Sequence, residues 1–219
     1  MTTWLQHVSQ WRDCQRCPLS QQRGRICLAR GSLPASVLLV GEAPGATEDA
    51  KGLPFKGPAG ALLDQIIDRS IPQGMTYTLT NLVACFPREA KERGDNEPST
   101  KEVLACRPRL VEFINLAQPR LIVRVGGLAT RHLDFNDTTS YVDIVHPAYI
   151  IRMPLAQQQM ATQRCIVQIR NAIEDLPPIK PFIPWKSNHA EAEASEELQR
   201  IYDEAASRGE RHPDDPIAF

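Results

Sequence analysis

The sequence predicts an α/β fold in which helices cover both faces of a parallel sheet. Short apolar segments typical of buried strands alternate along the chain with longer segments that repeat apolar residues at helical spacing. Such alternation favours parallel strands joined by crossover helices, and in folds of this kind ligands bind beyond the carboxyl ends of the strands. We therefore expect the functional residues in the turns that follow the strands.

Strands and helices are expected in a regular order along the chain. The four expected strands span residues 37–40, 77–80, 121–125 and 141–145. Three of them are rich in Val, Ile and Leu, as in strands buried on both faces, and residues 77–80 give the weaker signal. The three expected helices span residues 59–70, 101–116 and 155–176.

A proline-rich segment marks the expected end of the domain. Residues 177–184 contain four prolines, which cannot continue a helix and favour an extended path. We expect one domain over residues 1–176, followed by a linker and an acidic tail over residues 177–219. Within the tail, residues 190–206 have the apolar spacing of a marginal helix that would pack on the domain or bind a protein partner; a solvated tail is the alternative.

Composition bounds the setting of the protein. With 219 residues, of which 42% are hydrophobic, the chain is long enough to bury a single substantial core. The N-terminus has no basic start followed by an apolar stretch, and no run is long enough to span a bilayer, so we expect a cytoplasmic monomer without membrane contact. In a reducing compartment six cysteines favour metal or redox chemistry over a disulfide framework.

Charge is unevenly distributed along the chain. Residues 181–219 hold 4 Lys/Arg and 9 Asp/Glu, whereas residues 1–180 hold 21 Lys/Arg and 17 Asp/Glu. The formal net charge of −1 therefore hides a mildly basic domain. A surplus of this size is compatible with phosphate contacts but is also common in domains that bind no nucleic acid.

Polar motifs follow three of the expected strands. Residues 41–49 and 52–60 form a glycine-rich loop after the first strand, Asn81 follows the second and His146 follows the fourth. Glycines let the backbone approach a ligand closely, and a helix that begins near Ala59 offers free N–H donors to an anion or a carbonyl. The loop lacks the Gly-Lys-Ser/Thr ending of a P-loop, and its glycines do not have the spacing of a dinucleotide-binding fingerprint. Both observations argue against a nucleotide cofactor site.

Four cysteines form a second candidate site. Cys14 and Cys17 form a CxxC pair, and Cys85 and Cys106 lie on either side of a polar loop. Four thiolates hold either zinc or a 4Fe–4S cluster, and spacing alone does not distinguish the two. The two cysteines outside this pattern are Cys27 and Cys165.

Together, these motifs resemble the family 4 type of uracil-DNA glycosylases over roughly residues 5 to 175. The resemblance rests on CxxCPL at residues 14–19, GEAPG at 41–45, EDxxGxPFxGPAGxLL at 48–63, TNLVAC at 80–85, EVLACRPRL at 102–110 and HPAYIIR at 146–152. It implies a three-layer α/β/α sandwich with four parallel strands, and an enzyme that removes uracil from DNA by hydrolysing the glycosidic bond. It also implies a structural 4Fe–4S cluster held by Cys14, Cys17, Cys85 and Cys106.

The resemblance also implies roles for the pocket residues. Phe55 would stack on the uracil, and Asn81 would read the pyrimidine edge after the nucleotide has rotated out of the duplex. His146 would donate a hydrogen bond to the departing base, and Glu42 would position or deprotonate the attacking water, with Glu48 as a second participant. The other implied contacts are from the backbone of Ala43 to Gly45 to the base or sugar, from Ile150 or Ile151 to the gap in the duplex, and from Arg152 to a phosphate.

The sequence departs from this family pattern in two intervals. The stretch between Cys85 and Cys106 is longer than usual and resembles that of a related branch that attaches covalently to DNA through a loop histidine. The stretch here contains no histidine, so we expect hydrolysis. The stretch between Leu133 and His146 is shorter than usual. Three alternatives stay open: a glycosylase for a modified base, a non-catalytic member that binds DNA or a partner, and, from the cysteines alone, an iron–sulfur redox protein.

Overall fold

The computed structural model describes residues 2–88, 97–133, 139–179 and 181–185. The described residues belong to one compact unit that runs to Trp185. The helix expected at residues 190–206 lies outside the described residues, as do residues 89–96 and 134–138 of the two unusual intervals. In the described part of the chain, no helix is long and apolar enough to cross a membrane.

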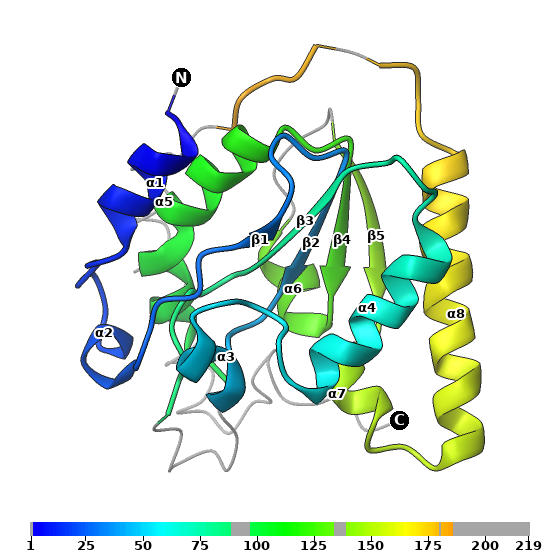
Figure 1. Cartoon of the computed structure of the whole chain (residues 1–219), viewed down its shortest axis with the longest axis horizontal. Coiled ribbons are helices and arrows are strands. Elements are labelled where there is room, and N and C mark those ends of the chain that lie inside the picture. Colours follow the sequence, from blue (N-terminus) through cyan, green and yellow to red (C-terminus); the bar gives the residue numbers. More distant parts are fainter. Residues whose placement is uncertain (1, 89–96, 134–138, 180, 186–219) are drawn as a thin grey trace, which may run out of the picture. The chain divides into compact units, whose positions relative to one another are not determined.

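A mixed sheet forms the centre of this unit, with the strand order β1-β3-β2-β4-β5 (Figure 1). The strands are β1 (Arg30–Gly31), β2 (Val37–Gly41), β3 (Tyr77–Asn81), β4 (Leu121–Val125) and β5 (Ser140–Ile144). Strands β2 to β5 are parallel and correspond to the four that the sequence predicts. The prediction of a four-stranded parallel sheet is wrong at one edge, where β1 pairs antiparallel with β3. A strand of two residues is too short to show an apolar period in the sequence.

Helices surround the sheet and begin at recognisable signals. They are α1 (Trp4–Trp11), α2 (Leu19–Gln22), α3 (Ala46–Lys51), α4 (Pro58–Ser70), α5 (Thr100–Ala117), α6 (Gly127–His132), α7 (Pro147–Ile150) and α8 (Leu155–Glu174). The three predicted helices are confirmed as α4, α5 and α8. Pro58 begins α4 at a position where no N–H is needed, and Ser99 with Glu102 forms a capping box at the start of α5.

Alternate residues of the central strands face two separate cores. Leu38 of β2 packs in one cluster with Phe113 of α5, whereas Leu39 packs in another with Ile66 of α4 and Ile169 of α8. Figure 1 shows the same arrangement, with α1 and α5 on one side of the sheet and α4 and α8 on the other. The predicted α/β class is therefore confirmed, with helices on both faces of the sheet.

The compact unit extends beyond the boundary that the sequence places at residue 176. Trp185 is buried against the cluster that includes α5. Its backbone N–H donates to Asn115 Oδ1 at 2.7 Å, and its carbonyl oxygen accepts from Asn115 Nδ2 at 3.0 Å. The prolines end the last helix, but the chain after them still packs on the domain as far as Trp185.

Candidate active site and cysteine cavity

The predicted pocket residues gather at the carboxyl ends of the strands, on the side where α3 and α7 lie in Figure 1. The register of the parallel strands β2 and β3 pairs Gly41 with Asn81. A Cβ atom on Gly41 would lie 2.6 Å from Asn81 Oδ1 and would also overlap Phe55 Cζ. Because position 41 is a glycine, the ring of Phe55 and the amide of Asn81 meet over the end of β2.

The amide of Asn81 is buried but not fully bonded. The residue is 2% exposed, and its Oδ1 has no hydrogen-bond partner in the described part of the chain. Leaving a buried acceptor without a partner costs about 1–3 kcal/mol. Its backbone, in contrast, is fixed, since the carbonyl oxygen accepts from Arg109 Nη2 at 2.5 Å. The side chain thus offers an unpaired hydrogen-bond acceptor, and the backbone that carries it is held in place.

The turn that carries Phe55 is strained and firmly held. Phe55 has a φ of 54°, a left-handed conformation that is rare for a bulky residue. Arg30 of β1 donates from Nε to Pro54 O at 2.8 Å and from Nη2 to Phe55 O at 3.1 Å. The same Nη2 donates to Asp64 Oδ1 of α4 at 2.6 Å. These contacts fix the position of the ring before any ligand binds.

Glu48 is bonded to the backbone of the glycine-rich loop. Its Oε1 accepts from the N–H groups of Lys56 at 2.8 Å and Gly57 at 2.5 Å, and its Oε2 accepts from the N–H of Gly45 at 3.1 Å. Three backbone donors therefore surround one buried carboxylate. The N–H of Gly45, which the sequence predicts in contact with the base or sugar, is already committed to Glu48.

Glu42 and Ala43 follow β2 directly, and both residues are partly exposed. The carbonyl oxygen of Glu42 accepts from the N–H of Val83 at 3.1 Å, which continues the pairing of β2 and β3 beyond the strands. The backbone of Glu42 is therefore anchored beside the end of β3, one residue past the glycine over which Phe55 and Asn81 meet.

His146 is held as a neutral imidazole with a defined proton position. Its Nδ1 accepts a hydrogen bond from the N–H of Ala148 at 3.1 Å. Burial, together with the cation of Arg152, lowers the pKa of His146 to about 4, although the carboxylate of Glu48 opposes this shift. Because Nδ1 accepts, the single ring proton is on Nε2. The imidazole and the ring of Phe55 lie 6.4 Å apart between centroids, with 29° between their planes.

Helix α7 and the turn after it give different surroundings to the two isoleucines that were predicted as alternative wedges. Ile150 is fully buried in the core and does not reach the surface, which leaves Ile151 of the two alternatives. Ile151 is 39% exposed, and Arg152 is exposed beside it. Tyr149, to which the sequence analysis assigns no role, is 55% exposed on the same turn. Helical rotation over four residues decides which side chains point outward, and a short motif does not reveal it.

The four cysteines that were predicted as ligands line one cavity, and neither Cys27 nor Cys165 lines it. Arg23 Nη1 donates to Cys85 Sγ at 3.3 Å and to the carbonyl oxygen of Cys14 at 2.7 Å. Burial raises the pKa of Cys85 to about 11, and the neighbouring thiols add to this shift while Arg23 opposes it. The N-terminal segment, the chain after β3 and helix α5 therefore meet around a cavity rich in thiols.

The cavity was compared with the two metal centres that its thiols could hold. Among the described residues, no group of three or more His, Cys, Asp or Glu side chains is close enough to hold a single metal ion. Zinc needs its ligands in a tight tetrahedron, with Zn–S distances of about 2.3 Å. A 4Fe–4S cluster spreads its four thiolates over different iron atoms, so they stand farther apart. The four thiols that line one cavity are a donor set that either centre can use, so the residues present are chemically suited to a 4Fe–4S cluster.

Comparison with known proteins identifies the family of the chain. Residues 29–171 match the model of the uracil DNA glycosylase superfamily. The chain belongs to this superfamily. A type-4 uracil-DNA glycosylase from Pyrobaculum aerophilum is 36% identical over 123 residues, which are 56% of this chain and 60% of that protein. The type-4 enzyme of Saccharolobus solfataricus is 35% identical over 123 residues, 56% of this chain and 55% of that protein.

A longer match comes from Thermotoga maritima. Its type-4 uracil-DNA glycosylase is 27% identical over 188 residues, which cover 78% of this chain and 90% of that protein. The matches to the first two relatives, by contrast, span little more than half of those proteins. Membership of the uracil-DNA glycosylase superfamily thus rests on most of the domain, and the matched range includes Phe55, Asn81 and His146.

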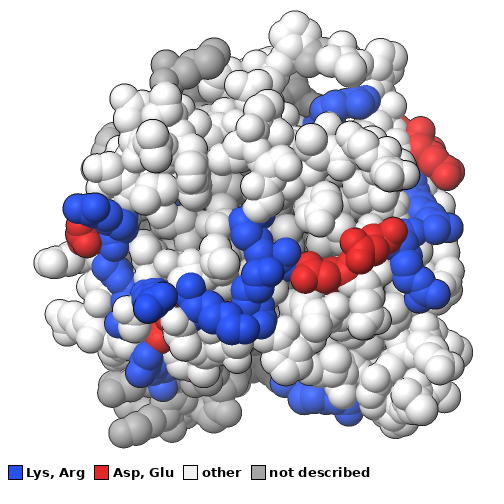
Figure 2. Space-filling view, in the orientation of Figure 1, with Lys and Arg blue, Asp and Glu red and all other residues white. Residues whose placement is uncertain are grey.

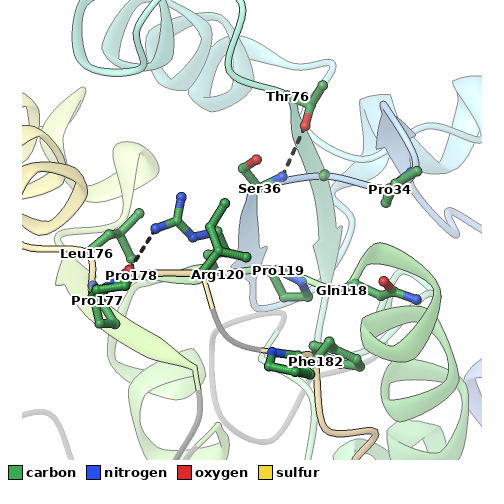
Figure 3. Close-up of a pocket in the computed structure, with 13 residues that line it drawn as sticks. Pro34, Ser36, Thr76, Gln118, Pro119, Arg120, Leu176, Pro177, Pro178 and Phe182 are labelled. Carbon is green, nitrogen blue, oxygen red and sulfur yellow. Dashed lines mark hydrogen bonds between the residues drawn. The ribbon is translucent and has the colours of Figure 1, made fainter.

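Another cavity lies at the opposite, amino-terminal end of the sheet of this glycosylase fold (Figure 3). Figure 3 shows Arg120 donating to the carbonyl oxygen of Pro177 at 2.8 Å, and the N–H of Ser36 donating to Thr76 Oγ1 at 3.1 Å. None of the predicted site residues lines this cavity. It is therefore separate from both candidate sites.

Positive charge gathers on one face of the glycosylase domain. Figure 2 shows Lys and Arg side chains forming a band over the part of the face that carries α2 and α3 in Figure 1. Exposed basic residues of the segments around these helices include Arg25, Lys51 and Lys56. Part of the Lys and Arg content of residues 1–180 therefore lies together on this face.

The residues that support the glycosylase pocket are the ones that sequence patterns missed. Arg30 and Asp64 hold the Phe55 turn, although Arg30 is 25 residues from Phe55 and 34 from Asp64 along the chain. Gly126, with a φ of 91°, leaves room for His146, because a Cβ atom there would lie 3.0 Å from His146 Cβ. Contacts between distant segments leave no periodic signal, so only the folded structure brings these residues to the site.

Proposed function

We propose that the protein removes uracil from DNA by hydrolysing the N-glycosidic bond, the activity for which its type-4 relatives are named. The observation that carries this proposal is the buried, unpartnered Oδ1 of Asn81 beside the ring of Phe55. A pyrimidine rotated out of the stack and placed on Phe55 would present its Watson–Crick edge to this amide. Uracil has a donor at N3 that suits Oδ1, whereas cytosine has an acceptor at the same position.

Bond cleavage would use the neutral imidazole of His146. Its Nε2–H would donate to the uracil carbonyl at position 2, where negative charge grows as the base departs. A preorganised donor of this kind typically contributes about two to three powers of ten in rate. The lowered pKa supports the role, since the imidazole is already neutral near pH 7 and its other nitrogen is fixed by Ala148.

The attacking water would be activated by Glu42. The oxygen of this water would add to C1′ of the deoxyribose, and one proton of the water would pass to the carboxylate of Glu42. The electron pair of the N1–C1′ bond would leave with the uracil. Glu48 is the less suitable base, because three backbone N–H groups already occupy its oxygens. We therefore assign Glu48 to holding the loop that carries Phe55, in place of the catalytic role that the sequence predicts for it.

The four cysteines that line one cavity would hold a 4Fe–4S cluster. When bound, the cluster would act as a structural cross-link between the N-terminal segment, the chain after β3 and helix α5. DNA would lie across the carboxyl ends of the strands, where Arg152 would contact a phosphate and Ile151 would fill the gap left by the flipped nucleotide. The monomeric state and a protein partner of the acidic tail stay predictions.

The test is single-turnover release of free base from matched oligonucleotides that carry uracil, cytosine, thymine or a modified base. Release from the uracil strand alone is expected. Asn81→Asp should weaken discrimination between uracil and cytosine, whereas Asn171→Asp, the same change on an exposed position of α8, should not. Release from the modified base alone would favour a different substrate, and DNA binding without any release would favour a non-catalytic member of the superfamily.

A further inference from the structure

Arg109 is a buried cation between the cysteine cavity and the candidate active site. It lies on α5, three residues after Cys106, so the two residues share a face of the helix. The residue is 1% exposed and is among the largest fully buried side chains of the described chain. It also lines the cavity with the four cysteines. One guanidinium thus borders both sites.

Among the described residues, the hydrogen bonds of Arg109 go to the end of β3 and none goes to a cysteine. Nη1 donates to Thr80 Oγ1 at 2.8 Å, and Nη2 donates to the carbonyl oxygens of Asn81 at 2.5 Å and Leu82 at 2.9 Å. Nε is buried and has no hydrogen-bond partner among the described residues. No carboxylate in that part of the chain accepts a hydrogen bond from Arg109; the nearby Glu112 accepts instead from His7 Nδ1 at 2.7 Å.

A buried charge in this position needs compensation. Taking an unpaired cation out of water costs several kcal/mol, so buried charges are retained when they are paired with an opposite charge. The carbonyl and hydroxyl oxygens around Nη1 and Nη2 are dipoles and carry no net charge. The thiolates that would ligate a cluster in the adjoining cavity would supply negative charge beside the guanidinium, because Arg109 lines that cavity together with all four cysteines.

We propose that Arg109 is a positioning residue that couples the cluster cavity to Asn81. Its charge balances the ligand thiolates, and its forked donors fix the carboxyl end of β3, from which Asn81 projects. The same end of β3 holds the start of the glycine-rich loop, because the N–H groups of Leu82 and Val83 donate to the carbonyl oxygens of Gly41 and Glu42. The consequence for base reading rests on the proposed function; the coupling itself does not.

Substitutions at Arg109 separate its two roles. Arg109→Gln removes the charge, whereas Arg109→Lys keeps the charge but lacks the planar fork that reaches three acceptors. Arg16→Gln is the matched control, since Arg16 also lines the cavity but is exposed and, among the described residues, donates only to the carbonyl oxygen of Ala105. Two measurements need no DNA: the rate of iron release to a chelator, followed by visible absorbance, and amide hydrogen exchange at Leu82 and Val83.

The expected pattern differs between the variants. Arg109→Gln should release iron roughly 10–100-fold faster than the parent, the usual cost of removing a supporting group next to metal ligands. Arg109→Lys should release iron at nearly the parent rate but should exchange the amides of Leu82 and Val83 faster. Arg16→Gln should match the parent in both measurements.

Several results would overturn the coupling. Equal iron release from folded Arg109→Gln and Arg16→Gln would show that the charge does not serve the cluster. Parent-like exchange at Leu82 and Val83 in Arg109→Lys would show that the fork does not hold β3, and this variant decides alone if Arg109→Gln does not fold. A parent that excises no uracil would remove the proposed function, while the iron and exchange results would still decide the role of Arg109.

Discussion

Removing the guanidinium of Arg30 tests whether the Phe55 turn is held from outside. Arg30→Met keeps the length of the side chain but takes the donors away from Pro54 O, Phe55 O and Asp64 Oδ1. Hydrogen bonds to charged groups contribute about 1.5–3 kcal/mol each, and an unfavourable backbone conformation such as that of Phe55 costs about 1–3 kcal/mol. The two bonds to the turn together outweigh the cost of the Phe55 conformation by roughly 2 kcal/mol, so the turn should relax once Arg30 no longer bonds to it.

The loss of these contacts should appear in stability and in rate. We expect the free energy of unfolding to fall by about 2 kcal/mol, which corresponds to a decrease in Tm of about 4–8 °C for a domain of this size. Displacement of a stacking ring by about 1 Å costs on the order of 100-fold in rate. Excision of uracil from a single-stranded oligonucleotide under single-turnover conditions, beside a thermal melt, measures both effects.

Another arginine that donates twice to backbone carbonyl oxygen supplies the control. Arg170 of α8 donates from Nε at 2.9 Å and from Nη2 at 2.5 Å to the carbonyl oxygen of Arg69, and among the described residues it makes no hydrogen bond to the Phe55 turn. Arg170→Met should therefore leave the excision rate unchanged. The reasoning about Phe55 would be refuted if Arg30→Met and Arg170→Met had the same excision rate and the same Tm.

Four further outcomes are expected. Asn81→Asp should lower the ratio of uracil to cytosine excision while changing Tm little, because the carboxylate keeps the acceptor and loses the amide donor. The pKa of His146 is lowered to about 4 from 6.5, so the unfolded chain takes up the proton first on acidification. The free energy of unfolding should therefore fall between pH 6.5 and 4 by up to about 3 kcal/mol, and denaturant titrations of His146→Gln should show a smaller decrease. Cys85→Ser should abolish visible absorbance and bound iron in the purified protein, whereas Cys165→Ser should keep both. Truncation after Trp185 should preserve Tm and excision, whereas truncation after Leu176 should lower Tm, because it also removes the contact with Asn115.

The sequence was sufficient to predict where the site lies, because a parallel sheet leaves little freedom at its carboxyl end. Once residues 37–41, 77–81 and 140–144 are parallel strands, the residues after them must emerge at one edge. Gly41 and Asn81 are directly opposite in the register, so the motifs that follow them lie side by side in any conformation of the loops. The long helices were predictable for a similar reason, since each buries one apolar face over several turns.

The supporting contacts could not be predicted, because each depends on a side chain that arrives from a distant segment. Arg30 acts from a two-residue edge strand, which has no period to detect. Glu48 was predicted from its motif as a second catalytic participant, and the three N–H groups around it favour the supporting role that we propose for it. Ile150 and Ile151 are identical side chains in adjacent positions, and only the rotation of α7 places the first in the core and the second at the surface.

Two costly local features come together at this edge of the sheet, next to a glycine that makes room for His146. Phe55 has a positive φ, Asn81 keeps a buried oxygen without a partner among the described residues, and Gly126 adopts a φ of 91° against His146. Each of the first two costs about 1–3 kcal/mol, a large share of the stability of a typical domain. A fold without a catalytic pocket gains nothing from these costs. A pocket that must stack, read and polarise one base needs the side chains of Phe55, Asn81 and His146 in fixed positions. Their convergence on one edge therefore favours a catalytic member of the superfamily over a non-catalytic one.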